Sequence, residues 1–221
     1  HGVEHVPASG GALLVGNHAL LGIDSVALFP ELFHQTGRVP RGLALRDLFS
    51  IRPIGRALHK IGLVSGDRST AVDLLGAGEL CVCYPGGIRD SLKGPDARYE
   101  LRWGERRGFA AAAASAGVPV VPVAAIGPDD AYPQLRAAAR LQAAILGPER
   151  LPAPVFLPVP RRVSFHFFFG RPIAPPPEPG AASVAAFAAE AREALEGLID
   201  DGLTQVGGST STARTSSRPT S

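Results

Sequence analysis

Short hydrophobic runs alternate along this chain with longer amphipathic or alanine-rich segments. The short runs predict β-strands, because each is apolar, spans a few residues and ends at a turn or a polar pair. The longer segments predict helices, several of which begin or end at Pro or Gly. The predicted strands are Ala12–Gly16, Gly42–Arg46, Leu63–Ser65, Leu80–Tyr84, Val118–Ile126 and Val163–Phe169. The predicted helices are Asp24–Gln35 with Asp24 as its N-cap, Pro53–Ile61, Ser69–Leu75, Arg107–Ala116 and Val184–Leu203.

Strands that alternate with helices favour an α/β fold. We expect a single layered domain over residues 1–203, with a mostly parallel central sheet flanked by helices. Residues 204–221 are rich in Ser and Thr and have no apolar face, which predicts a disordered tail. Phe109 to Pro128 carries no charge and has the length of a membrane span. Pro119 and Pro122 lie near its middle, so a buried helix running into a buried strand is the better interpretation.

The composition excludes several classes of protein. The net charge is only +2, with 22 basic and 20 acidic residues, which is not the basic balance of a dedicated nucleic-acid binder. Two cysteines, Cys81 and Cys83, are too few for a disulfide framework, and their alternation within one strand predicts buried free thiols on one face. The chain has no Met and starts at His1, so we expect it to derive from a longer translation product.

Three familiar catalytic motifs are absent from the sequence. Gly62-Leu-Val-Ser-Gly66 lacks the Gly-x-Ser-x-Gly spacing of a hydrolase elbow. The chain contains no Gly-x-x-x-x-Gly-Lys-Ser/Thr loop for nucleotide phosphates. Gly76-Ala-Gly78 precedes a strand, whereas a dinucleotide fingerprint follows one.

His18 and Asp24 form the first candidate for chemistry. Asn17 and His18 follow the first predicted strand, where ligand-facing groups of an open α/β sheet are usually found. Gly16 and Gly22 bracket a turn that can bring Asp24 back toward the imidazole. An Asp that accepts from one ring nitrogen leaves the other free to take a proton from a hydroxyl. Taken alone, the pair is better explained as a turn histidine and a helix-capping aspartate.

Three further blocks follow His18 in the sequence. Tyr84-Pro-Gly-Gly-Ile-Arg-Asp90 comes directly after a hydrophobic strand, and its glycines let backbone amides approach a ligand while Arg89 adds a donor fork. Gly66-Asp-Arg68 offers a second cation, and Val118-Pro-Val-Val-Pro-Val123 predicts a rigid buried strand. Taken separately, the first block fits an ordinary strand-exit turn equally well. A surface salt bridge is the better interpretation of Arg68, and the Val118 block is structural on its own.

The order of the four blocks resembles the glycerolipid acyltransferase superfamily, which includes the 1-acylglycerol-3-phosphate acyltransferases. The resemblance spans roughly Val6 to Ile173 and implies the fold of those enzymes. Five residues separate His18 from Asp24, where the best-known members have four, and Gly86-Gly87 stands where those members have Glu-Gly. Both departures look like the branch of diacylglycerol acyltransferase-like and phytyl ester synthase-like proteins. That branch also has an Arg-Trp pair before a Gly-Phe-Ala segment, as in Arg102–Ala110 here.

The resemblance implies an acyl-CoA-dependent O-acyltransferase of lipid metabolism. His18, oriented by Asp24, is then the general base on an acceptor hydroxyl, which attacks the thioester of acyl-CoA or acyl carrier protein. No metal and no cofactor beyond this co-substrate is implied. The residues expected to bind substrates are Asn17, Arg68, Gly86, Gly87 and Arg89. Of these, the Gly86 and Gly87 amides are expected to stabilise the oxyanion, and Arg68 or Arg89 to hold the acceptor or the CoA phosphates.

Three expectations about substrates and location also follow from the resemblance. The missing Glu favours a neutral acceptor, such as mono- or diacylglycerol or a long-chain alcohol, and no nucleic-acid partner is expected. The resemblance also implies a peripheral enzyme that acts at the cytoplasmic face of a membrane. The segment Leu135–Leu157 combines apolar residues with arginines, which suits a helix at a membrane interface. A connecting helix followed by a loop explains this segment equally well. The alternatives are a 1-acylglycerol-3-phosphate acyltransferase of phospholipid synthesis and a non-catalytic lipid- or acyl-CoA-binding protein.

Overall fold

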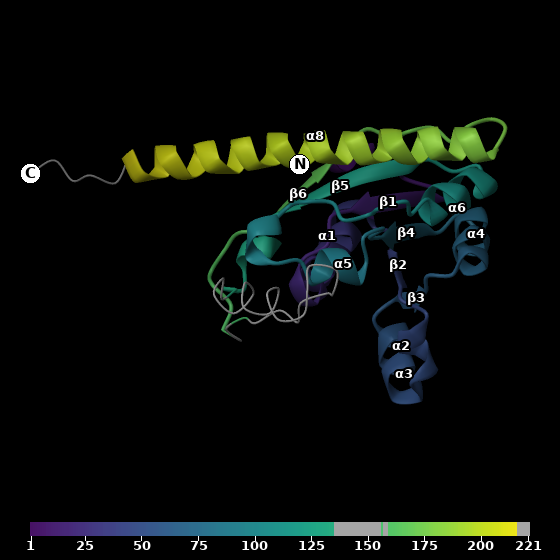
Figure 1. Ribbon diagram of the computed structural model, residues 1–221, viewed down its shortest axis with the longest axis horizontal. Helices are drawn as coiled ribbons and strands as arrows, with labels where there is room; N and C mark the ends of the chain where they lie inside the picture. Colours follow the sequence, from purple (N-terminus) through teal and green to yellow (C-terminus); the bar gives the residue numbers. More distant parts are fainter. Residues whose placement is uncertain (135–155, 157–158, 216–221) are drawn as a thin grey trace, which may run out of the picture.

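Six strands form one sheet in the order β3-β2-β4-β1-β5-β6 in the computed structural model, which describes residues 1–134, 156 and 159–215 (Figure 1). The first five strands in this order run parallel, and β6 runs antiparallel to β5. The expected α/β fold with a mostly parallel sheet is therefore confirmed. The strands are β1 (Ala12–Gly16), β2 (Arg41–Ala44), β3 (Leu63–Ser65), β4 (Leu80–Cys83), β5 (Val120–Ile126) and β6 (His166–Phe169).

Helices cover both faces of the sheet, which explains why its central strands are apolar at nearly every position. On one face α1 (Ile23–Thr36) places Leu28 and Leu32 against Leu14 of β1. On the other face α4 (Arg68–Gly76), α6 (Gly108–Ala116) and α8 (Ala181–Thr215) pack against the sheet, and Leu13 joins that second core. Leu13 and Leu14 thus serve opposite cores, as the alternation of side chains along a strand requires.

Short elements make most of the remaining connections. α2 and α3 project away from the sheet beyond β3, whereas α5 lies beside η2 (Figure 1). These elements are η1 (Val3–His5), η2 (Leu20–Gly22), α2 (Asp47–Ser50), α3 (Arg52–Lys60), α5 (Ile88–Ser91), η3 (Pro95–Ala97) and η4 (Pro128–Asp130). None of them except α3 was expected from the sequence, because a single helical turn has no periodicity to reveal it.

Two predicted boundaries were wrong at the ends of helices. Asp24 is not the N-cap of α1: Gly22 occupies that position, and Asp24 lies in the first turn with its carboxylate bonded elsewhere. The last helix does not end at Leu203, since α8 continues to Thr215 through the polar stretch that was expected to be disordered from residue 204. A helix that is already formed adds residues at little cost, because each new residue gains a backbone hydrogen bond.

Two predicted strands start later than expected. β5 begins at Val120 instead of Val118, because the carbonyl of Pro119 is the first group to meet β1, accepting from Leu13. β6 begins at His166 instead of Val163, where its ladder with Ile126 starts. The last helix starts three residues earlier than predicted, at Ala181 instead of Val184. The other predicted elements occupy their expected places to within one or two residues.

The uncharged stretch from Phe109 to Pro128 is a buried helix followed by a buried strand, as predicted. α6 supplies four buried alanines of one core, and β5, between β1 and β6, is buried at every position. Among the helices that the structure describes, none has the length and apolarity of a membrane span. The stretch Leu135–Leu157 lies outside the described residues, apart from Phe156, which bridges to Gln134.

Candidate active site

The candidate site lies at the carboxyl ends of three neighbouring strands, β4, β1 and β5. Tyr84 directly follows β4, His18 comes two residues after β1, and Asp129 lies in η4 just after β5. Because these strands are adjacent and parallel, their carboxyl ends lie along one edge of the sheet. This is the edge at which open α/β sheets place ligands.

His18 and Asp24 form a hydrogen-bonded pair at this edge. The distance between Nδ1 of His18 and Oδ2 of Asp24 is 2.9 Å, and the Asp24 carboxylate also accepts from the backbone amide of Ala19 at 3.3 Å. Asp24 is fully buried, whereas the His18 side chain keeps 18% of its surface exposed. Since an ionised carboxylate only accepts, Nδ1 carries the proton and Nε2 remains free to take another.

Two neighbours fix the plane of the imidazole and leave its outer edge open. The ring of Tyr84 stacks on His18 with centroids 4.1 Å apart and an interplanar angle of 14°. Tyr84 accepts a hydrogen bond from Ser25, and its burial, followed by the charge of Asp24, raises the pKa of its phenol, so Tyr84 stays neutral. Gly22 has a φ of +67°, and a Cβ there would lie 3.4 Å from Cε1 of His18. Glycine at this position keeps the Nε2 side uncrowded.

Asn17 joins the loop after β1 to the neighbouring strand β5. Its side chain donates to the carbonyl of Ala125 at 3.0 Å and accepts from the amide of Ala125 at 2.8 Å. Asn17 is also only 1% exposed. Asn17 therefore ties the end of β1 to β5 directly before His18, and the substrate-binding role expected for it stays a prediction.

Lys93 holds His18 from its backbone side, a contact that the sequence did not reveal. Its ammonium donates to the carbonyl of His18 at 2.9 Å and pairs with Asp129 at 2.9 Å. Lys93 is 3% exposed, and Asp129 also accepts from the amide of Tyr99. Burial raises the pKa of Asp129, although the charge of Lys93 opposes this effect. The only hint in the sequence is that Lys93 is one of two lysines in a chain of 22 basic residues.

The Gly86–Gly87 turn is shaped by Asp90 and Arg106. A methyl group on Gly86 would overlap the carboxylate of Asp90. Asp90 is fully buried, and its carboxylate accepts a hydrogen bond from the backbone amide of Arg102 at 2.6 Å. The burial raises the pKa of Asp90. Arg106 donates to the carbonyls of Pro85 and Gly86 at 3.0 and 2.7 Å. The Gly87 amide donates to Tyr84, so within the described residues only the Gly86 amide of this pair lacks a partner.

The two arginines expected to bind substrates lie in different surroundings. Arg89 is exposed on α5, which lies beside the η2 turn of the His18 loop, and it has no ion pair with any residue that the structure describes. Arg68 starts α4 and donates to Ser115 of α6 at 3.0 Å. The helix that carries Arg89 thus lies beside the His18 loop, whereas Arg68 forms a hydrogen bond that joins α4 to α6.

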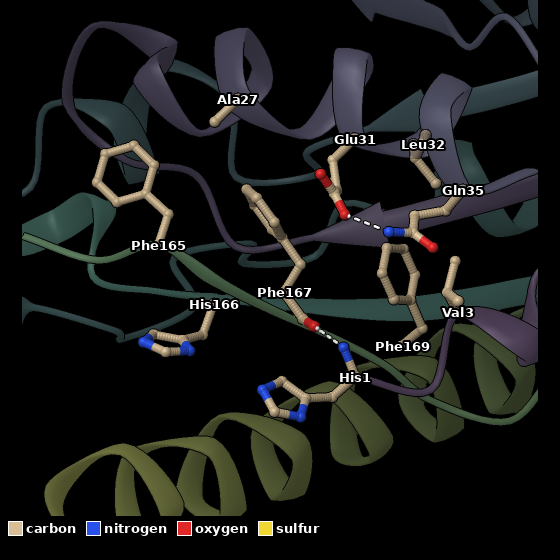
Figure 2. A pocket seen from close by; sticks show the side chains of 10 residues that line it. All are labelled: His1, Val3, Ala27, Glu31, Leu32, Gln35, Phe165, His166, Phe167 and Phe169. Carbon is tan, nitrogen blue, oxygen red and sulfur yellow. Dashed lines mark hydrogen bonds between the residues drawn. The ribbon is translucent and has the colours of Figure 1, made fainter. Parts of the chain in front are cut away.

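A cavity of about 470 Å³ lies apart from this constellation, between α1 and β6 (Figure 2). Phe165, Phe167 and Phe169 form one wall, and Glu31 and Gln35 of α1 form the other, joined by a hydrogen bond of 2.9 Å. Neither His18 nor Asp24 lines it. Over the described parts of the chain, no group of three or more His, Cys, Asp or Glu side chains is arranged to hold a metal ion.

Comparison with known proteins decides the family. A model of the acyltransferase family matches residues 1–126, which is more than half of the 221 residues and includes every residue of the His18, Arg68 and Gly86 blocks. The chain belongs to this acyltransferase family. The resemblance inferred from the four ordered blocks is thereby confirmed.

Curated relatives extend over more residues than this chain. A human protein named "DGAT1/2-independent enzyme synthesizing storage lipids" is 35% identical over 123 residues, which cover 56% of this chain and 38% of the relative. An uncharacterized protein of Mycobacterium tuberculosis is 35% identical over 184 residues, which cover 78% of this chain and 51% of the relative. The chain therefore spans about half, or less, of the length of these relatives.

The fold of this acyltransferase domain also matches a solved structure. The 1-acyl-sn-glycerophosphate acyltransferase of Thermotoga maritima superposes with a TM-score of 0.53, covering 90% of this chain and 70% of the other. The sequence identity is 17%, so the likeness concerns the fold alone. It agrees with the predicted layered α/β architecture.

Proposed function

We propose that this domain transfers a fatty acyl group from acyl-CoA, or from acyl carrier protein, to the hydroxyl of a lipid acceptor. The observation that carries the proposal is the hydrogen bond of 2.9 Å between Nδ1 of His18 and the buried Asp24, with no hydrogen bond from Nε2 to any other residue that the structure describes. A histidine held in one tautomer by a buried carboxylate is the arrangement that a general base requires. A lipid-binding protein without catalysis has no need of this pair.

The reaction follows from the geometry of the pair. Nε2 of His18 takes the proton of the acceptor hydroxyl as its oxygen attacks the thioester carbonyl, and the Asp24 carboxylate stabilises the resulting imidazolium. The carbon–sulfur bond then breaks, and the thiolate of the carrier leaves and receives a proton from the imidazolium. The Gly86 amide is the candidate donor to the tetrahedral oxyanion. Arg89 is the candidate partner for the phosphates of CoA.

A neutral acceptor, such as mono- or diacylglycerol or a long-chain alcohol, is the substrate class we propose. The relatives from human, cattle and mouse are named for synthesizing storage lipids, which supports this choice. Gly86 and Gly87 stand where a phosphate-accepting enzyme of the superfamily has Glu-Gly. Such lipids partition into membranes, so we also propose peripheral work at the cytoplasmic face of a membrane.

Acyl transfer from a long-chain acyl-CoA tests the function directly. Diacylglycerol, a long-chain alcohol and lysophosphatidate are offered separately in detergent, and the products are identified by mass spectrometry. The wild type is expected to form neutral esters, and His18→Ala to lose at least a hundredfold of the rate, because a general base typically contributes about 10²–10⁴-fold. His34→Ala, which removes an exposed histidine of α1 instead, is the matched control and should keep full activity.

Each alternative has its own outcome in this experiment. Phosphatidate as the sole product would assign the domain to phospholipid synthesis. Full activity of His18→Ala would remove the proposed base. Binding of acyl-CoA with no product from any acceptor would favour a non-catalytic lipid-binding protein.

A further inference from the structure

Residues 45–61, which we call the α2–α3 arm, expose an unusual number of large apolar side chains. Leu45, Leu48, Ile51 and Ile61 are 56%, 40%, 51% and 64% exposed. They are four of the ten large hydrophobic side chains exposed in the described parts of the chain. Single exposed apolar residues are ordinary on a protein surface, but a cluster of them marks an interaction site.

Cations are interspersed among these apolar residues. The arm holds four of the 22 Lys and Arg residues, namely Arg46, Arg52, Arg56 and Lys60, but only one of the 20 Asp and Glu residues, Asp47. The rest of the chain therefore has one more acid than base, so the net positive charge of +2 comes from the arm. All four cations are exposed, and none forms an ion pair with another described residue.

The packing of the arm explains why its apolar side chains face outward. The two short helices pack against each other, with Phe49 and His59 in contact at a centroid distance of 5.0 Å, and α3 packs against the edge strand β3. The arm stands away from the body of the domain (Figure 1). It leaves the sheet directly after β2, which is parallel to β1, so it starts at the same edge as the His18 loop.

A second apolar surface is continuous with the base of the arm. Phe33, Val39 and Ile61 line a shallow hollow of about 330 Å³ together with His59 and Lys60. Phe33 and Val39 are 55% and 53% exposed. The apolar side chains of the arm thus extend onto the end of α1, again beside a cation.

We propose that the α2–α3 arm docks the domain on the surface of an anionic phospholipid membrane. Leu45, Leu48 and Ile51 enter the boundary between headgroups and acyl chains, and Arg52 and Arg56 face the lipid phosphates. The inference rests on the proposed function only in that docking delivers a lipid acceptor to the same edge of the sheet as His18. Exposed aliphatic residues combined with excess cations match the chemistry of an anionic bilayer, whereas a nucleic-acid surface uses aromatic side chains for stacking.

Co-sedimentation with vesicles measures docking without any catalysis. The full chain is mixed with vesicles of phosphatidylcholine alone or of phosphatidylcholine with phosphatidylglycerol. Binding is expected only to the second kind and should weaken as NaCl is raised, because salt screens charges at the membrane surface. The double variant Arg52→Gln with Arg56→Gln should bind the vesicles roughly thirtyfold more weakly. Each cation near an anionic membrane surface raises the binding constant by a factor of about five to six.

Apolar contacts are tested by a second pair of variants with matched controls. Leu48→Ser with Ile51→Ser should weaken binding roughly tenfold or more. Val159→Ser with Leu203→Ser removes two exposed apolar residues elsewhere, and Arg161→Gln with Arg162→Gln removes two exposed cations elsewhere. Both control pairs should bind like the wild type. Circular dichroism confirms that each variant is folded.

A fluorescent probe keeps the proposal testable if an arm variant fails to fold. Cys81 and Cys83 are buried, so a dye at Ile51→Cys labels one position, and its emission should shift to the blue with anionic vesicles. The same dye at Leu203→Cys should not shift. His18→Ala should bind vesicles normally, which separates docking from catalysis. Arm variants that bind like the wild type, equal losses in the control pairs, or an unshifted probe at position 51 would each overturn the proposal.

Discussion

Asp24 and Lys93 are both buried charged side chains, and they hold His18 from two sides. Asp24 orients the imidazole through Nδ1, and Lys93 fixes the loop through the carbonyl of His18. Asp129 balances the charge of Lys93 at a distance of 2.9 Å. Buried charges are costly unless they are paired, so each of these groups depends on its partner. The position of the proposed general base therefore rests on several buried charges around it.

Asp24→Asn is expected to reduce the rate of acyl transfer about a hundredfold. The amide keeps the shape of the side chain but removes the negative charge that stabilises the imidazolium and selects the tautomer. Steady-state kinetics with a neutral acceptor should show the loss in kcat, with little change in the KM for acyl-CoA. Glu31→Gln, an exposed carboxylate on the same helix, is the control and should be fully active. Equal kcat values for Asp24→Asn and the wild type would refute the role given to Asp24.

Lys93→Met is expected to destabilise the fold by about 3–5 kcal/mol, because it leaves Asp129 buried without its cation. Urea unfolding followed by circular dichroism measures the change. The double variant Lys93→Met with Asp129→Asn removes both charges and should recover a large part of the lost stability. Lys60→Met, on the exposed surface of the arm, should have little effect. A double variant less stable than Lys93→Met would contradict the pairing.

At the scale of elements, the ends of helices decide how the chain turns toward the site. Gly22 and Gly37 bracket α1 in the left-handed region, with φ values of +67° and +69°. Asp67 caps α4 by accepting from the amide of Thr70 and from the hydroxyls of Ser69 and Thr70. These bonds, led by the amide of Thr70, hold the pKa of Asp67 well below its usual range. α4 therefore depends on an ionised cap.

Asp67→Ala is expected to lower the Tm, and the effect should depend on pH. The pKa of Asp67 is depressed in the folded state, so its stabilisation is present above its unfolded value of about 4 and is lost as pH falls through the folded value. The difference in Tm from the wild type should therefore be constant above about pH 5 and shrink below about pH 4. Calorimetry over this range measures the difference. A gap in Tm that stays constant down to the lowest accessible pH would show that the ionised cap is not its source.

At the scale of the whole molecule, the sheet lies between two cores and shields its thiols. Cys81 and Cys83 are both free and both face the core formed with α4, α6 and α8, as their alternation predicted. Burial raises the pKa of Cys81 to about 12 and raises that of Cys83 further. Cys81 is fully buried and Cys83 is only 8% exposed, so both thiols are shielded in the folded protein.

Both cysteines are expected to resist thiol reagents until the protein unfolds. With a pKa of about 12, only about one Cys81 thiol in ten thousand is ionised at pH 8, and burial blocks access to it. Labelling with a thiol-reactive dye should be absent in buffer and should reach two groups per chain in guanidinium chloride. Ile51→Cys adds an exposed thiol that should react at once. Rapid labelling of Cys81 in the native protein would mean that β4 is less protected than the structure shows.

The sequence predicted the strands and the chemical pair well, but the contacts around the pair poorly. Apolar runs such as β4 are visible because a strand buried on both faces is hydrophobic at every position. His18 and Asp24 are close in sequence and share one turn, so their spacing was informative. Lys93 lies 75 residues from His18 and Asn17 lies 108 residues from Ala125, and no local pattern reveals contacts of that kind.

The sequence by itself determined the order of strands and helices, because local hydrophobic periodicity indicates them. It also determined the family and the candidate base, because short motifs indicate both. Only the tertiary structure decided that Asn17 binds β5, that Asp24 is not a cap, that Gly86 must leave room for Asp90, and that the α2–α3 arm stands exposed. Each of these depends on which strands become neighbours and where their ends meet. The physical reason is that local patterns record which residues prefer burial, whereas strand pairing determines what each buried group touches.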